Sequence, residues 1–170
     1  SHSLSLAEHF SRRVRTLILA KQHYLGFSVA RDHRAIDAWT TSNGGNYLSI
    51  GVHGAITGHR ADLVIIDDPI KSQADAESSR QRDYIWDWYK SDVTTRLKPS
   101  GRVVLIMTRW HPDDLGGQLL EQAGSEWRVV RLPALAEQND PIGRTVGEPL
   151  WPEWEDHQAL ARKRQIIGER

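Results

Sequence analysis

Apolar residues recur along the chain with two different periods, and stretches of each kind alternate. Stretches with an apolar residue at every third or fourth position predict amphipathic helices, and short continuous apolar runs predict buried strands. Ser5 is the expected cap of the first helix, because Glu8 follows three residues later. The predicted helices cover Leu4 to about Lys21, Ser72 to about Leu97, about Pro112 to Ala123 and about Glu155 to Ile167.

The clearest predicted strand is Asp62–Ile66, whose four apolar residues are typical of a strand covered on both faces of a parallel sheet. Because strands alternate with helices, the sequence predicts an α/β fold with a largely parallel sheet. Further strands are expected at Ala35–Thr40 and Asn46–Val52, joined by a turn over Ser42–Gly45, and at Arg102–Met107 and Trp127–Leu132, with an extended loop over Pro133–Pro152.

The composition is that of a globular domain with one core. The chain has 170 residues, with 22 basic and 22 acidic side chains and no cysteine. This balance gives no overall electrostatic footprint for nucleic acid, although it is compatible with a local basic patch. The lack of cysteine excludes disulfides and thiolate metal sites and fits a reducing cytosol. No apolar run approaches the ~20 residues that a membrane helix needs.

Two carboxylates directly follow the clearest predicted strand. Asp67 and Asp68 come after Leu63-Val64-Ile65-Ile66, which is the Walker B pattern. The strand would anchor the first carboxylate where it can hold Mg²⁺, and the second can orient or deprotonate a water that attacks a γ-phosphate. A buried strand that ends in an Asp-Pro turn explains the same residues. This segment alone favours neither interpretation.

Thr108 and Arg109 follow the Arg102–Met107 strand in the same way. A hydroxyl and a guanidinium just past a buried strand can sense a γ-phosphate by hydrogen bonding and charge, and we favour this functional interpretation for both residues. For Asp113 and Asp114 we favour a structural role, because acidic residues stabilise the start of a helix.

The glycine-rich stretch Gly51–Gly58 precedes the first of these strands. Its glycines would let the backbone approach a ligand or DNA, but no Lys-Ser or Lys-Thr follows them, so they do not form a P-loop. A tight loop is the favoured interpretation, with His59 and Arg60 as candidate ligands. The eight histidines show no metal-ligand spacing, and we expect no zinc site.

A series of spaced motifs resembles the terminase large subunits of phages and prophages. The resemblance covers nearly the whole chain, and it is specific because several motifs occur in the same order. They are Phe10–Arg15 (FSRRVR), Gly54–Gly58 (GAITG), Leu63–Ile70 (LVIIDDPI), Arg80 with Trp86–Tyr89 (WDWY), Thr95–Leu97 (TRL), Met107–Leu115 (MTRWHPDDL), Leu132–Leu135 (LPAL) and Gly147–Pro152 (GEPLWP).

The resemblance implies a motor that uses ATP to drive double-stranded DNA into a capsid. In that family an ATPase of the RecA-like, additional-strand type precedes an RNase H-like nuclease. Carried over to this sequence, Asp67 resembles the Walker B ligand of Mg²⁺ and Asp68 the catalytic carboxylate, in a place often held by Glu. Thr108, with Arg109 beside it, resembles the motif that couples hydrolysis to motion. The implied cofactors are Mg²⁺ and ATP, the implied partners are double-stranded DNA, the terminase small subunit and the portal protein, and the implied location is the cytoplasm of a bacterial host.

The resemblance also implies a Walker A strand upstream of Ser1 and a nuclease downstream of Arg170. Residues 1–170 would then be a partial ATPase domain, with an incomplete RecA-like three-layer fold that lacks the Walker A strand. We expect this chain alone to bind ATP weakly or not at all and not to hydrolyse it. It is either a fragment of a longer protein or a degraded prophage remnant.

The missing strand would lie between Arg102–Met107 and Trp127–Leu132 and would leave each with an unpaired edge. The apolar residues of the first strand make its edge poorly suited to water. We expect a second copy of the chain to associate through this edge, rather than the two strands to close up.

Two other functions fit the same residues. The first is a stand-alone nuclease that holds two metal ions with Asp67, Asp68, Asp113 and Asp114, which requires these carboxylates to surround metals ~4 Å apart. The second is a non-enzymatic assembly module that docks to another terminase subunit or to the portal.

Overall fold

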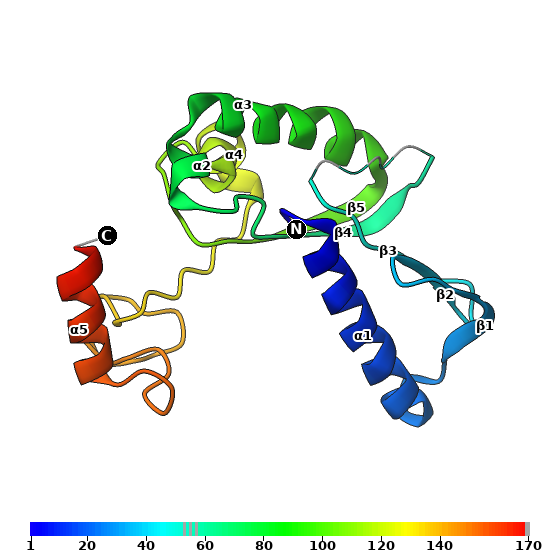
Figure 1. Cartoon of the computed structure of the whole chain (residues 1–170), viewed down its shortest axis with the longest axis horizontal. Helices are drawn as coiled ribbons and strands as arrows, with labels where there is room; N and C mark the ends of the chain where they lie inside the picture. Colours follow the sequence, from blue (N-terminus) through cyan, green and yellow to red (C-terminus); the bar gives the residue numbers. More distant parts are fainter. Residues whose placement is uncertain (53, 55, 57, 169–170) are drawn as a thin grey trace. The chain divides into compact units, whose positions relative to one another are not determined.

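The computed structural model describes residues 1–52, 54, 56 and 58–168, with the side chains of residues 33 and 34 excepted. The chain divides into two compact units, Ser1–Gly124 and Ser125–Arg170 (Figure 1). The first unit contains both sheets, and the second contains one longer helix and an extended loop. None of the helices in the described part of the chain has both the length and the apolar character that a membrane crossing requires.

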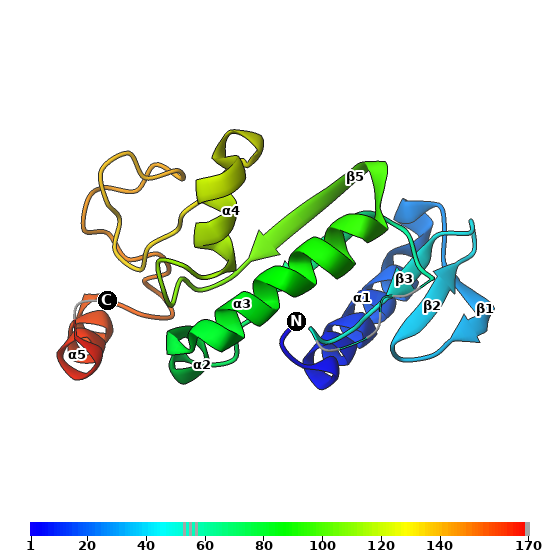
Figure 2. The same ribbon diagram turned by 90° about the horizontal axis from the view of Figure 1, so that it is seen from above.

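A parallel strand pair lies at the centre of the first unit. β4 (Ala61–Asp67) pairs with β5 (Leu97–Ile106), with Val64 opposite Val103 and Asp67 opposite Ile106. The connection between them contains α2 (Gln73–Glu77) and α3 (Ser79–Trp88). Both views show α3 running along the pair (Figures 1 and 2). The parallel pairing predicted from the apolar runs is therefore confirmed for these two strands.

The β4–β5 pair is covered on one face and open on the other. Side chains alternate between the faces, and opposed residues share a face. Ile66 is buried on the covered side, and the core also contains Ile85, Trp88, Val93, Leu115 and Leu119. On the other side Leu63, Ile65, Val104 and Ile106 are 52%, 58%, 43% and 54% exposed. Since parallel sheets normally have both faces covered, these four side chains form an unusually open apolar face, and we call them the open face.

The first helix packs against a small antiparallel sheet. α1 (Leu4–Leu25) begins after Ser3, whose hydroxyl accepts from Leu6 N, and ends at Gly26 in the left-handed conformation. The sheet contains β1 (Val29–Arg34), β2 (Ala38–Thr41) and β3 (Asn46–Leu48) in that order. Buried Ser11 joins helix to sheet, because its Oγ donates to the Ile36 carbonyl at 2.6 Å and accepts from Trp39 Nε1 at 2.9 Å.

Several element boundaries predicted from the sequence are wrong, and local hydrogen bonds explain some of them. The predicted helix Ser72–Leu97 is interrupted at Ser78, whose extended backbone and side chain cap α3. A π-helical turn over Tyr89–Val93 and a 3₁₀ turn over Thr94–Arg96 follow α3, and the expected stop at residues 99–101 lies inside β5. The cap of α1 is Ser3 rather than Ser5, and β1 was not predicted.

The predicted strand Trp127–Leu132 is also wrong, because this segment is irregular in the structure. A strand needs a neighbour to satisfy its backbone groups, and the described part of the second unit provides none. Val129, Val130 and Leu132 remain exposed. The observed sheets are therefore a parallel pair and a separate antiparallel sheet, not one largely parallel sheet.

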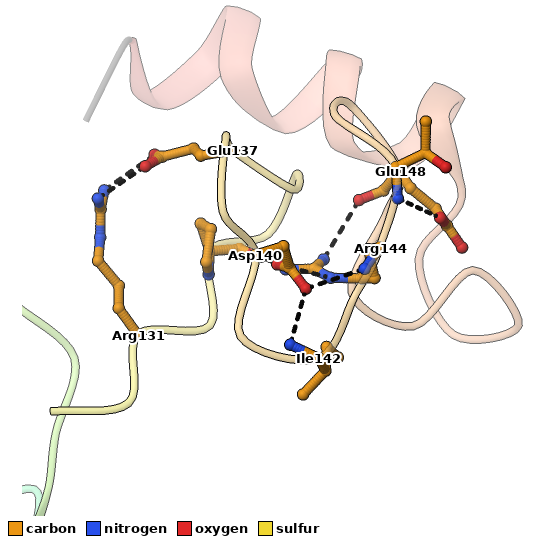
Figure 3. A network of polar contacts seen from close by, with 8 residues as sticks. Arg131, Glu137, Asp140, Ile142, Arg144 and Glu148 are labelled. Carbon is orange, nitrogen blue, oxygen red and sulfur yellow. Dashed lines mark hydrogen bonds and ion pairs between the residues drawn. The ribbon is translucent and has the colours of Figure 1, made fainter. Parts of the chain in front are cut away.

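A buried ion pair organises the second unit, which contains α5 (His157–Ile167). Figure 3 shows Arg144 between Asp140 and Glu148: its Nη2 lies 2.7 Å from Asp140 Oδ2, and its Nη1 donates to the Glu148 carbonyl. The Asp140 and Arg144 side chains are 0% and 7% exposed. Asp140 Oδ1 also accepts from the backbone N–H groups of Ile142 and Arg144. The extended loop expected at Pro133–Pro152 is thus held in shape by these side chains together with backbone hydrogen bonds, such as that from Ala136 N to the Glu148 carbonyl.

We predict that Ser11→Ala lowers the free energy of unfolding by about 1–3 kcal/mol, because it leaves the buried Trp39 Nε1 without an acceptor. Urea denaturation measures the change. Thr16→Ala is the matched control on the same helix, since Thr16 is exposed and its hydroxyl donates only to the preceding turn. Equal effects of the two substitutions would show that the Ser11–Trp39 bond does not stabilise the fold.

We predict an acid-dependent loss of stability from Asp140. Its hydrogen bond with Arg144 holds the pKa of the Asp140 carboxyl below its ordinary value, against the opposite effect of burial. Because the folded-state pKa is the lower one, this stabilisation is complete above the pKa of the unfolded carboxyl, about 4, and is lost as the pH falls through the folded-state value. Asp140→Asn removes this pH dependence, as measured by thermal unfolding from neutral to acid pH.

The control is Glu137→Gln, which breaks the exposed ion pair between Glu137 and Arg131 in the same loop (Figure 3). This substitution should leave the acid dependence nearly unchanged, because exposed pairs contribute little. An acid profile of Asp140→Asn that matches the unsubstituted chain would contradict the assignment.

Candidate functional site

β4 and β5 end side by side, and the predicted site residues lie around this common end. Asp68 follows β4, and its backbone N–H donates to the Ile106 carbonyl at 2.9 Å. The backbone N–H of Thr108, just past β5, donates to Asp68 Oδ1 at 3.1 Å. The strand pairing therefore brings Asp67, Asp68 and Thr108 together at the carboxyl ends of neighbouring parallel strands, as the sequence predicts.

Asp68 has an uncommon backbone conformation. Its φ is +40°, in a region that Asp and Asn enter more readily than most other residues. Its carbonyl accepts from His2 N at 3.1 Å, so Asp68 is bonded to β5, to the loop after β5 and to the first residues of the chain. These bonds fix the direction of its carboxylate toward Thr108. A restrained conformation of this kind is often found at functional sites.

Asp67 differs from Asp68 in its surroundings. Alternation along β4 puts it on the same side as Ile65, at the end of the open face. The pKa of the Ser1 amino group lies below its ordinary value because of burial, an effect that the negative charge of the Asp67 carboxylate opposes. Within the described part of the chain, the Asp67 carboxylate has no side-chain hydrogen bond. Its oxygens are therefore available to a hard cation, for which carboxylates are preferred ligands.

Arg109 is held within its own loop. Its Nε lies 2.8 Å from Oδ1 and 3.0 Å from Oδ2 of Asp114, and its Nη2 donates to the Pro112 carbonyl at 3.2 Å. The Arg109 side chain is nevertheless half-exposed, so part of the guanidinium faces solvent. Thr108 is exposed as well. Both predicted residues are thus accessible, and the loop that contains them is ordered by hydrogen bonds.

The structural role predicted for Asp114 is confirmed. It caps α4 (Leu115–Ala123) by accepting from Gly117 N at 3.0 Å, so the helix begins at Leu115 rather than at Pro112. Asp113 is 69% exposed and its backbone N–H donates to His111 Nδ1. The bond between Asp114 and Arg109 is the feature that sequence reasoning missed. The one feature of the sequence that could have indicated this bond is the position of an arginine five residues before the capping aspartate.

The four carboxylates of the nuclease hypothesis do not converge. Among the described residues, no group of three or more His, Cys, Asp or Glu side chains is arranged to hold a metal ion. Asp114 is fully buried against Arg109 and backbone N–H groups, and Asp113 lies on the exposed side of its turn. The arrangement around two metals that this hypothesis requires is therefore not formed by these side chains.

The glycine-rich stretch packs against the start of the chain. A Cβ at Gly51 would lie 2.9 Å from Leu4 N, and Val52 N donates to the Ser1 carbonyl at 2.9 Å. The close approach that Gly51 permits is therefore to the chain's own first residues. His53, Ala55 and Thr57 lie outside the described residues, and the candidate ligands His59 and Arg60 are exposed.

Comparison with known proteins identifies the family. The family model described as terminase large subunit, T4likevirus-type, N-terminal, matches residues 7–169. The chain belongs to this terminase family. The match extends through both structural units and includes Asp67, Asp68, Thr108 and Arg109. Membership in the terminase large-subunit family links the chain to phage DNA packaging. No curated protein matches the chain significantly.

Proposed function

We propose that this chain is the C-terminal half of the ATPase domain of a phage or prophage terminase large subunit, and that it works in an ATP-driven DNA-packaging motor. Asp67 is the Mg²⁺ ligand, Asp68 orients or deprotonates the attacking water, and Thr108 with Arg109 couples hydrolysis to motion. The main support is the hydrogen bond between Asp68 Oδ1 and Thr108 N, because it joins the carboxylate of one strand to the loop of the next.

The architecture supports an incomplete RecA-like fold. β4, the helices α2 and α3, and β5 form a parallel β-α-β unit, and the predicted site residues follow the carboxyl ends of its strands. In open α/β sheets, ligands bind at this end. The open face fits a sheet that is completed by further elements, and so does the outer edge of β5, which pairs with no second strand among the described residues. In the terminase family that the sequence resembles, the element that would complete this sheet is the Walker A strand.

Asp67 and Asp68 fit different parts of the chemistry. Asp67 has free carboxylate oxygens beside the strand end, which suits a ligand of Mg²⁺. The bound ion would neutralise charge on the phosphates of ATP. Asp68 already uses Oδ1 to accept from Thr108 N, and its remaining oxygen lone pairs can accept a hydrogen bond or a proton from water.

The hydrogen bond between Thr108 N and Asp68 Oδ1 gives a physical route by which ATP hydrolysis could be coupled to motion. A proton gained by the Asp68 carboxylate lowers its negative charge and weakens its bond to Thr108 N. Thr108 is followed directly by Arg109, whose side chain is tied to the start of α4 through Asp114. A change of charge at Asp68 would therefore reach the loop between β5 and α4 through directly bonded groups. This function places the chain with double-stranded DNA, the small subunit and the portal, in the cytoplasm of a bacterial host.

We predict different effects of Asp68→Asn and Asp67→Asn in a terminase large subunit that contains this sequence. Asp68→Asn retains an acceptor for Thr108 N and tolerates the positive φ, so ATP binding persists while turnover falls by on the order of 10²-fold or more. Asp67→Asn weakens the Mg²⁺-dependent part of nucleotide binding. Calorimetry with and without Mg²⁺ and steady-state ATP hydrolysis measure these effects.

Asp62→Asn is the matched control, because Asp62 lies at the opposite end of β4 and pairs only with exposed Lys98 at 2.8 Å. It should leave binding and turnover nearly unchanged. Equal and mild effects of Asp67→Asn and Asp68→Asn on turnover would refute the two assigned roles.

We predict that two copies of the 170-residue chain associate through the outer edge of β5. Among the described residues, β5 pairs with β4 alone, and Val104 and Ile106 are exposed beside that edge. An identical edge on a second copy can satisfy the unpaired backbone groups of both chains in a two-fold arrangement. Light scattering over a concentration series measures the association, and Val104→Lys should weaken it.

Val129→Lys is the control, since Val129 is an exposed valine of the other unit. A strict monomer at high concentration would contradict the predicted association, and so would an equal loss of association with both lysine variants.

A further inference from the structure

Among the described residues, Asp114 is the one charged residue that is buried as a whole, backbone and side chain together, with 0% exposure. A buried carboxylate is costly unless its oxygens are hydrogen-bonded. Asp114 meets this requirement with donors from two sources. Arg109 Nε, Trp110 N and His111 N come from the loop after β5, and Gly117 N comes from the first turn of α4.

This set of donors does more than a helix cap needs. Capping requires only the bond from Gly117 N, at 3.0 Å. The other bonds fix the direction of the backbone at residues 110 and 111 and hold the Arg109 side chain at its Nε. Because Leu115 and Leu119 of α4 are buried in the core, these bonds attach the loop to a fixed support.

The chain offers a direct comparison in Asp156, which caps α5. Asp156 has nearly the same backbone angles as Asp114, and its Oδ1 accepts from Ala159 N at 2.8 Å. It is exposed, and no donor from a preceding loop is recorded for it among the described residues. The loop-facing bonds of Asp114 are therefore an addition to capping.

Close packing supports the same role. A Cβ at Gly117 would clash with the Pro112 carbonyl oxygen and would lie 2.9 Å from Arg109 Nη2. A Cβ at Gly116 would lie 3.3 Å from Met107 Sδ, which is closer than an ordinary contact. The turn from Arg109 to Gly117 thus closes on itself without spare room, and the Asp114 carboxylate satisfies the polar groups at its centre.

We propose that Asp114 is a positioning residue for the Thr108–Arg109 segment. Its carboxylate locks the loop after β5 onto α4, so that Thr108 N meets Asp68 and the guanidinium of Arg109 keeps its half-exposed position. This inference rests on the proposed function of Thr108 and Arg109. It assigns to Asp114 a role that capping alone does not explain, and Asp114 itself touches no reacting atom.

The test uses Asp114→Ser, because serine caps a helix about as well as aspartate but is too short to reach the loop donors. Asp156→Ser is the matched control. In the 170-residue chain, hydrogen exchange of the Thr108, Trp110 and His111 amides should become faster in Asp114→Ser, while amides in the middle of α4 keep their protection. Asp156→Ser should leave the loop amides unchanged. Should Asp114→Ser not fold, Asp114→Asn serves in its place, since it keeps the cap but offers an amide to some of the loop donors.

The second readout is DNA-stimulated ATP hydrolysis by a terminase large subunit that contains this sequence. Asp114→Ser should lower kcat by on the order of tenfold to a hundredfold, as expected for misplaced groups, and leave the Kd for nucleotide unchanged. Asp156→Ser should change neither. If Asp114 acts through Arg109, the double variant Asp114→Ser with Arg109→Ala should be no slower than Arg109→Ala alone.

The outcomes separate the inference from the proposed function. Unchanged loop exchange in Asp114→Ser, or an unchanged kcat while Arg109→Ala lowers kcat, would overturn the positioning role. Unchanged turnover in both Thr108→Val and Arg109→Ala would overturn the proposed function instead. In that case, faster hydrogen exchange of the loop amides in Asp114→Ser would still support the attachment of the loop by Asp114.

Discussion

The parallel pairing of β4 with β5 is the constraint on which the rest of the first unit depends. It sets Asp67 opposite Ile106, and the residues just beyond each strand consequently meet at one end of the pair. The pairing exists because the connection through α2 and α3 is long enough to return the chain in the same direction, and because α3 runs along one face of the two strands. Without it, Asp68 and Thr108 would be separated by forty residues of chain.

The end of this strand pair is held by polar contacts rather than by apolar packing. Asp68 and Asp114 each accept hydrogen bonds from backbone N–H groups of the segment that follows β5. One carboxylate is fixed from β4 and the other from α4, so the short segment between β5 and α4 is held at both ends. Ionised acceptors form stronger bonds than neutral ones, and the position of this segment is therefore sensitive to the charge of both residues.

The second unit is ordered by a different means. With α5 as its one longer helix in the described residues, its loop depends on the buried Asp140–Arg144 pair and on backbone bonds such as that between Leu150 N and the Ala134 carbonyl. A buried ion pair is a poor source of net stability, but its geometry is specific, and removal of one partner leaves the other charge unpaired. The loop therefore combines one specific buried ion pair with backbone hydrogen bonds.

The sequence by itself determined the approximate extent of α1, α4 and α5, the apolar parts of β4 and β5, and the positions of Asp67, Asp68, Thr108 and Arg109 just beyond those strands. These features follow from local periodicity, which is present in the chain before it folds. It also indicated the terminase family, because several motifs occur in one order. The structural role of Asp114 as a cap was predictable from its place before an apolar helix.

Only the tertiary structure decided which backbone groups found partners. Trp127–Leu132 has the residues of a strand, yet it stays irregular because the described part of its unit offers no neighbouring strand. β1 is a strand although its sequence has no run of apolar residues of the kind that predicts one, because β2 pairs with it. The bonds of Asp114 to Arg109 and of Asp68 to Thr108 join residues whose contact depends on how the loop turns. The local sequence shows which donor and acceptor groups are present. The three-dimensional fold determines which of them form hydrogen bonds, because the donor and acceptor atoms must come within about 3 Å of each other.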